Sequence, residues 1–206
     1  DKDLCAPRRL LSRRDKKLAR ARAHLREFRV SRALKARFKK RGRLCISHKS
    51  ADGKTIVAVG FARQKFGLDL EILKPRDFAA ASEFCFNAFE RELLAATDES
   101  EKMLIFYKIY TIKEALIKAR SLGFYALARV GLARGADGEA LALDERGRAW
   151  PYKSYILEDE ILMLIYQRST TLDWQMYTGV GIMGAIAGAI ASLLLPRSYE
   201  SKSLNK

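Results

Sequence analysis

GLDLE (residues 67–71) and YTIKEALIK (residues 110–118) decide how the rest of this chain is interpreted. The first segment has the apolar character of a strand, and the second has the spacing of an amphipathic helix. On a strand, Asp69 and Glu71 are two residues apart, so their carboxylates point to one face. Glu114 adds a third carboxylate from the helix. Oxygen ligands of this kind are those that Mg²⁺ takes together with substrate phosphates, so the pattern indicates a site for a divalent metal and a phosphorylated ligand.

Each of these patterns also has a purely structural explanation. Asp69 and Glu71 alternate with apolar residues, and a half-exposed strand shows the same alternation without a metal. Glu114 and Lys118 lie one helical turn apart, and such a pair stabilises an exposed helix by about 0.3–0.5 kcal/mol. Spacing alone therefore leaves both interpretations open.

Positive charge is concentrated at one end of the chain. The 206 residues carry a net charge of +15, and residues 1–43 alone hold 18 Lys and Arg against 4 Asp and Glu, a net of +14. So dense a field of like charge repels itself, so we expect an anionic partner: a phosphate-rich small molecule, a nucleic acid or a membrane surface. Cys5, Cys45 and Cys85 are far apart, which favours free thiols over a zinc site or a disulfide framework.

The order of elements predicts an α+β fold with a mostly antiparallel sheet. Ser12 followed by Asp15 indicates the start of the first helix, and Ser100 is the expected N-cap of the last. We expect helices within residues 10–41, 78–96 and 101–120, and strands at 44–47, 55–62, 66–73, 125–132, 139–143, 153–157 and 161–166.

Residues 177–195 differ from the rest because they carry no charge and are rich in Gly and Ala. The length is near the ~20 residues of a membrane span, so we expect an apolar C-terminal helix that either contacts a membrane or is buried. The chain would then divide into residues 1–62, 63–170 and a tail at 171–206. The first 40 residues lack the apolar segment of a signal peptide, so we expect a cytoplasmic protein, with membrane association through the tail as the alternative.

Taken in order, these motifs resemble those of the 4′-phosphopantetheinyl transferases, particularly the surfactin-synthetase-type branch. Family members have a Ser-His pair at a strand end, a Gly-(Val/Ile)-Asp-(Ile/Leu)-Glu strand, and a helix with Trp-(Ser/Thr)-x-Lys-Glu-Ala-x-x-Lys. This chain has Ser47-His48 followed by the two segments quoted above. Phe86–Leu94 also resembles the family's Phe-x-x-x-Glu-x-x-x-Leu helix. The resemblance covers residues 10–166, and it departs from the family at Tyr110, where the family has Trp.

The resemblance implies a fold of two similar α+β halves, each an antiparallel sheet with packed helices, forming one pseudo-symmetric unit. It also implies an enzyme of the holo-[acyl-carrier-protein] synthase type. Such an enzyme moves 4′-phosphopantetheine from coenzyme A to a serine of an apo acyl or peptidyl carrier protein, needs Mg²⁺, and releases adenosine 3′,5′-bisphosphate. The carrier would serve fatty acid biosynthesis or secondary metabolism. We expect a monomer.

Residue by residue, the resemblance implies that Asp69, Glu71 and Glu114 hold Mg²⁺ against the pyrophosphate of coenzyme A. Glu114 or Glu71 would take the proton from the carrier serine. Lys118, together with Lys113, would offset charge on the pyrophosphate.

The resemblance implies that residues nearer the N-terminus contact the nucleotide part of coenzyme A. Ser47 and His48 would lie near the nucleotide phosphates. Arg32, with Lys35 or Arg37 nearby, would contact the 3′-phosphate, which gives the basic segment an anionic ligand. Relatives commonly have a longer linker before the Ser-His pair.

A basic nucleic-acid-binding protein without enzymatic activity is the alternative. It rests on the charge of residues 1–43, but a nucleic-acid-binding face would interleave aromatic residues with the basic ones or present a known motif. Phe28 and Phe38 are the available aromatics in this segment, and both lie on the apolar stripe of the expected helix. We therefore expect no nucleic acid partner.

Overall fold

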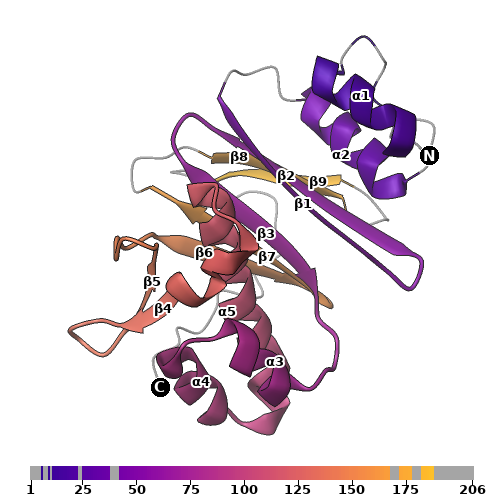
Figure 1. The fold of residues 1–206 in the computed structure, drawn as a ribbon. Coiled ribbons are helices and arrows are strands. Elements are labelled where there is room, and N and C mark those ends of the chain that lie inside the picture. Colours follow the sequence, from indigo (N-terminus) through magenta and orange to yellow (C-terminus); the bar gives the residue numbers. More distant parts are fainter. Residues whose placement is uncertain are drawn as a thin grey trace. The chain divides into compact units, whose positions relative to one another are not determined.

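The protein is described by a computed structural model that covers residues 6, 9, 11–22, 25–37, 42–167, 172–177 and 182–187. The chain forms two compact units. The first unit comprises Asp1–Arg63 and Thr171–Leu194, and the second comprises Gln64–Thr170 and Leu195–Lys206. Both units combine helices with antiparallel sheets (Figure 1), which confirms the α+β class. The pseudo-symmetric pairing of the halves stays a prediction.

The first unit consists of two helices and one four-stranded antiparallel sheet. The strand order in the sheet is β1-β2-β8-β9. The elements are α1 (Arg13–Arg22), α2 (Arg26–Arg37), β1 (Arg43–Ala51), β2 (Lys54–Ala62), β8 (Leu172–Tyr177) and β9 (Ile182–Ala187).

Helix α2 packs its apolar stripe on the sheet. Val30 and Leu34 of α2 form a buried cluster with Val57 and Val59 of β2, so the apolar spacing within the basic segment is that of a core-facing helix. Helix α1 begins where the sequence indicated, because the Ser12 hydroxyl accepts from the backbone N–H of Asp15 at 3.1 Å and donates to its carboxylate at 2.7 Å.

The tail is where the structure departs most from the sequence prediction. We expected an apolar helix across residues 177–195, but Ile182–Ala187 forms strand β9. Strand β8 pairs with β2, and β9 pairs with β8, so the ladder satisfies the backbone groups of β9 that face β8. Described residues of the expected tail thus belong to a sheet, and the rest of the run lies outside the described residues. Of the helices that the structure describes, none has both the length and the apolarity of a membrane span.

The second unit is built around one long helix. Its three-stranded antiparallel sheet has the order β3-β7-β6, and β4 and β5 form a hairpin. The elements are β3 (Phe66–Ile72), α3 (Phe78–Cys85), α4 (Ala88–Ala95), α5 (Glu99–Arg120), the 3₁₀-helix η3 (Phe124–Arg129), β4 (Gly131–Arg134), β5 (Ala140–Leu143), β6 (Tyr152–Leu157) and β7 (Glu160–Tyr166).

Helix α5 is surrounded by its neighbours. It packs on β3 and β7 and also contacts α3, α4 and β4. The apolar side chains that periodicity placed on it, Ile109, Ile112 and Leu116 among them, lie in the core. Gly67 allows the helix to approach β3 closely, because a Cβ at this position would lie 1.8 Å from the carbonyl oxygen of Ala115.

Three local predictions in this unit are wrong. Residues 78–96 form two helices rather than one, because Asn87 and Glu90 make a capping box that starts α4. Residues 124–129 are a 3₁₀-helix, and the strand begins only at Gly131. Asp98, not Ser100, is the N-cap of α5, and it makes no side-chain capping bond.

Candidate functional site

Strand β3 directs Asp69 and Glu71 toward α5. Gly67 lies against the backbone of α5, and residues 69 and 71 share its face of the strand. The carboxylate of Asp69 accepts a hydrogen bond from Lys118 Nζ at 2.6 Å, which joins the strand to the last turns of the helix. Both acidic side chains are buried. Asp69 and Glu71 therefore do not lie on a solvent-exposed strand, because every residue of β3 is buried.

Glu114 reaches the same region through Tyr110. The Tyr110 hydroxyl donates to Glu114 Oε1 at 3.4 Å. Burial raises the pKa of Tyr110, and the negative charges of Glu114, Glu71 and Asp69 raise it further. The charges of all three carboxylates thus act on one hydroxyl, which itself contacts Glu114. The phenol stays protonated and remains a hydrogen-bond donor.

The donor set fits a hard divalent cation. Three carboxylates near one another repel, and a cation offsets that repulsion; Lys118 supplies one positive charge, and an oxygen-only set suits Mg²⁺. In this structure the oxygens of the three residues do not all lie within 4.8 Å of one another. In the described ranges, the carboxylates that meet this condition are those of Glu158–Glu160, consecutive residues at the β6–β7 turn.

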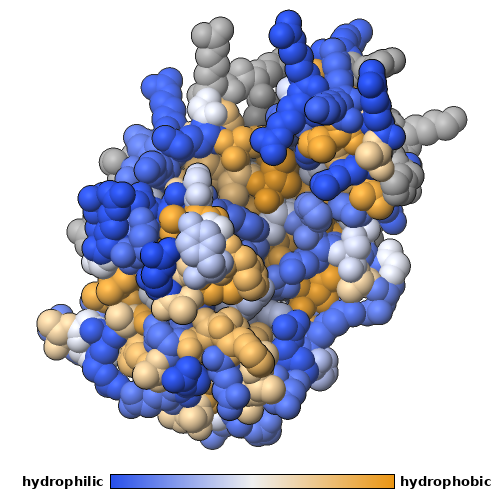
Figure 2. All heavy atoms as spheres, in the orientation of Figure 1, coloured by the Kyte–Doolittle hydropathy of each residue, from blue (hydrophilic) through white to orange (hydrophobic). Residues whose placement is uncertain are grey.

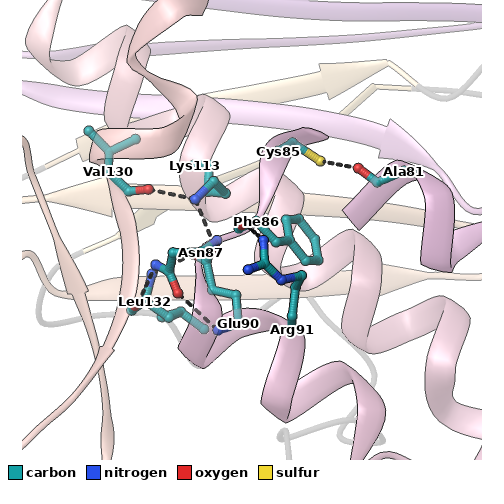
Figure 3. Close-up of polar contacts among 9 residues, drawn as sticks. All are labelled: Ala81, Cys85, Phe86, Asn87, Glu90, Arg91, Lys113, Val130 and Leu132. Atoms are coloured by element: carbon teal, nitrogen blue, oxygen red, sulfur yellow. Dashed lines mark hydrogen bonds and ion pairs between the residues drawn. The ribbon is translucent and has the colours of Figure 1, made fainter. Parts of the chain in front are cut away.

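Lys118 and Lys113 differ in their placement. The Lys118 side chain is 27% exposed and lies beside Asp69. Lys113 is fully buried, and its amine contacts Glu90 and the carbonyl of Val130 (Figure 3). The contact of Lys113 with coenzyme A phosphates stays a prediction; in this structure the amine is enclosed by Glu90 and Val130.

The predicted nucleotide-side residues lie in the first unit. Ser47 and His48 occupy the middle of β1 rather than its end; Ser47 is buried and His48 is exposed, as alternation along a strand requires. Arg32 and Lys35 each bind the carboxylate of Asp15 at 2.6 Å. The side chain of Arg37 is outside the described residues.

Asp15 is the acidic centre of this basic unit. Burial alone would raise its pKa, but bonds from Lys35, Ser12 and Arg32 outweigh burial and lower the pKa to about 2. Arg32 and Lys35 are thereby brought together at one point on the unit.

Exposed basic side chains cover α1. Figure 2 shows hydrophilic side chains projecting from the surface formed by this helix. They include Arg13, Arg14, Lys16, Lys17, Arg20 and Arg22. This face is therefore strongly positive.

Two features of the site escaped the sequence interpretation. The first is the hydroxyl of Tyr110, which was considered only as an aromatic substitute for Trp. The second is the partnership of Lys113 with Glu90. Asn87 and Glu90 have the spacing of a capping box, so a signal for the start of α4 was present. No local pattern links Glu90 with Lys113, which follows 23 residues later.

The family-model match falls on the second unit. Residues 65–160 match the family model described as the 4′-phosphopantetheinyl transferase superfamily. Over 79 residues the chain is 35% identical to the 4′-phosphopantetheinyl transferase HetI of Nostoc sp., an overlap of 38% of this chain and 33% of that protein. The chain thus spans about a third of the length of this curated relative. The crystal structure of holo-[acyl-carrier-protein] synthase from Neisseria meningitidis aligns with a TM-score of 0.35 at 17% identity, covering 50% of this chain and 98% of that one.

Proposed function

We propose, because residues 65–160 carry the 4′-phosphopantetheinyl transferase superfamily region, that this protein transfers 4′-phosphopantetheine from coenzyme A to a serine of an apo acyl or peptidyl carrier protein. The reaction would depend on Mg²⁺ and release adenosine 3′,5′-bisphosphate. The observation that carries the proposal is the packing of β3, with buried Asp69 and Glu71, against α5. On that helix Lys118 bonds to Asp69, and Tyr110 bonds to Glu114. All five residues lie within the matched region.

Asp69, Glu71 and Glu114 are the residues that would hold the metal. Two of them come from β3 and the third from α5, which pack closely because of Gly67. Bound Mg²⁺ would supply charge neutralisation and polarisation at the pyrophosphate.

Lys118 would offset charge on the phosphates directly. Its amine already bonds to a carboxylate oxygen and is partly open to solvent, so a pyrophosphate oxygen can share or replace Asp69 as partner without any unfolding of the helix. A fixed positive charge beside phosphate oxygens stabilises the negative charge that develops during transfer.

Glu114 is the better candidate for the general base. It is half-buried, whereas Glu71 is buried, so Glu114 is the more accessible to a serine on another protein. The Tyr110 hydroxyl orients it. Glu114 takes the serine proton, the serine oxygen forms a bond to the β-phosphorus, and the bridging P–O bond breaks. The leaving bisphosphate takes the electron pair of that bond.

The basic residues of the first unit are proposed to meet the remaining negative charge. Arg32 and Lys35, which both bind Asp15, are candidates to contact the 3′-phosphate. His48 is exposed, so its imidazole could donate to a phosphate oxygen. The exposed basic residues of α1 suit an acidic carrier protein, because complementary charge accelerates and orients docking.

Intact-mass spectrometry tests the proposal. Purified protein is incubated with coenzyme A, Mg²⁺ and several apo carrier proteins, and each carrier is weighed. We expect the mass of at least one carrier to increase by one phosphopantetheine. The same carrier with its acceptor serine changed to alanine is the control. An unchanged mass for every carrier would refute the proposal.

Nucleic acid binding is the second candidate, and the exposed basic residues of α1 favour it. Such binding would weaken steeply with salt, because each phosphate contact releases counterions. Fluorescence anisotropy with labelled RNA and DNA at two salt concentrations measures it. Tight, salt-dependent binding together with no carrier modification would favour this function over transfer.

A further inference from the structure

Lys113 and Glu90 form a closed ion pair inside the second unit. Lys113 Nζ lies 2.7 Å from Glu90 Oε2, and both side chains have 0% exposure. Figure 3 shows the lysine reaching from α5 and the glutamate from α4. A ligand cannot reach this pair without opening the core, so the pair needs an explanation other than binding.

The remaining polar atoms of the pair are also engaged. Glu90 Oε1 accepts from the backbone N–H of Leu132 at 2.7 Å, and Oε2 accepts from the backbone N–H of Asn87 at 2.8 Å. Lys113 donates to the carbonyl of Val130 at 2.7 Å. We call these contacts the Lys113–Glu90 network. It joins the start of α4, the middle of α5 and the start of β4.

Gly131 makes room for the network. A Cβ at this position would lie 2.0 Å from Glu90 Oε1 and 2.7 Å from Lys113 Nζ, and its φ of +138° suits glycine. The strand backbone therefore lies directly against the two charges.

Such a network restricts the position and rotation of α5. A buried ion pair contributes little net stability compared with apolar residues, but losing one partner leaves an uncompensated charge in the core. Moving α5 by one residue turns it by about 100° and separates Lys113 from Glu90 and Val130. The network therefore favours one rotation of α5 about its axis and one position along that axis.

We propose that the Lys113–Glu90 network positions Glu114 and Lys118 for phosphopantetheine transfer, with Lys113 acting as a positioning residue. Glu114 is the next residue along the helix, and Lys118 is five residues beyond Lys113. Fixing the helix at Lys113 sets the direction in which both side chains leave it. This inference rests on the proposed function, and it assigns Lys113 a role that needs no contact with coenzyme A.

A double variant separates positioning from stability. Lys113→Met with Glu90→Gln removes both charges and keeps the side chains at similar size, and Gln retains an acceptor for a backbone N–H. We expect kcat to fall by about 10–100-fold, while the KM for coenzyme A changes less than about threefold. The near-ultraviolet circular dichroism should remain that of a folded core.

The matched control changes a surface pair that joins α4 and β4, two of the three elements that the Lys113–Glu90 network joins. Arg134 of β4 contacts Glu92 of α4 at 3.1 Å, and these side chains are 57% and 66% exposed. Arg134→Met with Glu92→Gln should leave kcat within about twofold of the wild type. A kcat for the Lys113 double variant equal to that of the control would overturn the proposal.

Amide hydrogen exchange supplies a readout that does not depend on activity. We expect faster exchange at residues 114–118 in the Lys113 double variant and unchanged exchange in the control. Should the double variant fail to fold, Glu90→Asp, which keeps the charge and shortens the side chain, is measured in its place with the same expectations. Wild-type protein that modifies no carrier would refute the proposed function, whereas unchanged exchange in the folded variant would refute the positioning role.

Discussion

Two lysine–carboxylate pairs on α5 have the same chemistry and different surroundings. Lys113 and Glu90 lie 2.7 Å apart with both side chains fully buried. Lys118 and Asp69 lie 2.6 Å apart, but Lys118 is 27% exposed and Asp69 3%. The comparison teaches that distance does not tell which pair a ligand could reach. Access does, because a ligand can exchange with a partner only where solvent already reaches.

The difference follows from what packs on each side of the helix. Lys113 faces α4 and the start of β4, whose backbone N–H and carbonyl groups complete its network. Lys118 faces β3, and its amine bonds to Asp69. The same helix therefore carries a fully buried ion pair, Lys113–Glu90, on one side and a partly exposed ion pair, Lys118–Asp69, on the other.

Removing each lysine in turn should give the largest contrast. Lys113→Met leaves Glu90 charged in the core and should lower the free energy of unfolding by about 3–5 kcal/mol. Lys118→Met should lower it by about 1–2 kcal/mol, because the Lys118 side chain is partly exposed and water can reach the Asp69 carboxylate that it leaves behind. Urea denaturation followed by circular dichroism measures both. Equal losses for the two variants would contradict the distinction.

Removing the carboxylate of Glu114 should lower the rate of transfer and leave the stability nearly unchanged. Glu114→Ala removes a proposed metal ligand and base, so we expect transfer to fall by about 10²–10³-fold. The melting temperature should stay close to that of the wild type, since Glu114 is half-buried at most. Glu101→Ala, at an exposed position on the same helix, is the control. Activity that survives in Glu114→Ala would show that the metal and base assignments are wrong.

A third pair on α5 should give the smallest effect, and one that depends on pH. Arg120 binds Glu145 through two nitrogens, at 2.6 and 3.0 Å, and these bonds, opposed by burial, lower the pKa of Glu145 from 4.5 to about 2. A carboxylate with a lowered pKa stabilises the fold fully above its unfolded pKa and loses that contribution as pH falls toward the folded value. Stability should therefore decline between about pH 4.5 and pH 2.

Glu145→Gln tests this expectation. The variant lacks the titrating carboxylate, so its urea midpoint should fall less between these two pH values than the midpoint of the wild type. Glu92→Gln, at a surface pair, should behave as the wild type does. An identical acid dependence for the wild type and Glu145→Gln would contradict the pairing.

Much of the second unit could be predicted because its signals are local. The strand at residues 66–72 and the helix that ends at Arg120 have clear periodicity, and both were found within a few residues of their bounds. The sequence prediction missed the break between α3 and α4 because the apolar pattern continues across it. The capping box at Asn87 is what starts a new helix there. Strand β9 was missed because a Gly- and Ala-rich run fits a helix or a strand equally, and only pairing with β8 decides between them.

The sequence by itself determined that Asp69 and Glu71 share a face, that Glu114 and Lys118 share another, and that the chain has a basic beginning. These properties follow from the periods of strand and helix and from simple counting. Only the tertiary structure decided which lysine of α5 is closed in the core and which remains within reach of a ligand. Glu90 lies 23 residues before Lys113 in the chain, and Leu132 lies 42 residues after Glu90. Partners so distant come together only through packing, and that packing gave two lysines of one helix different environments.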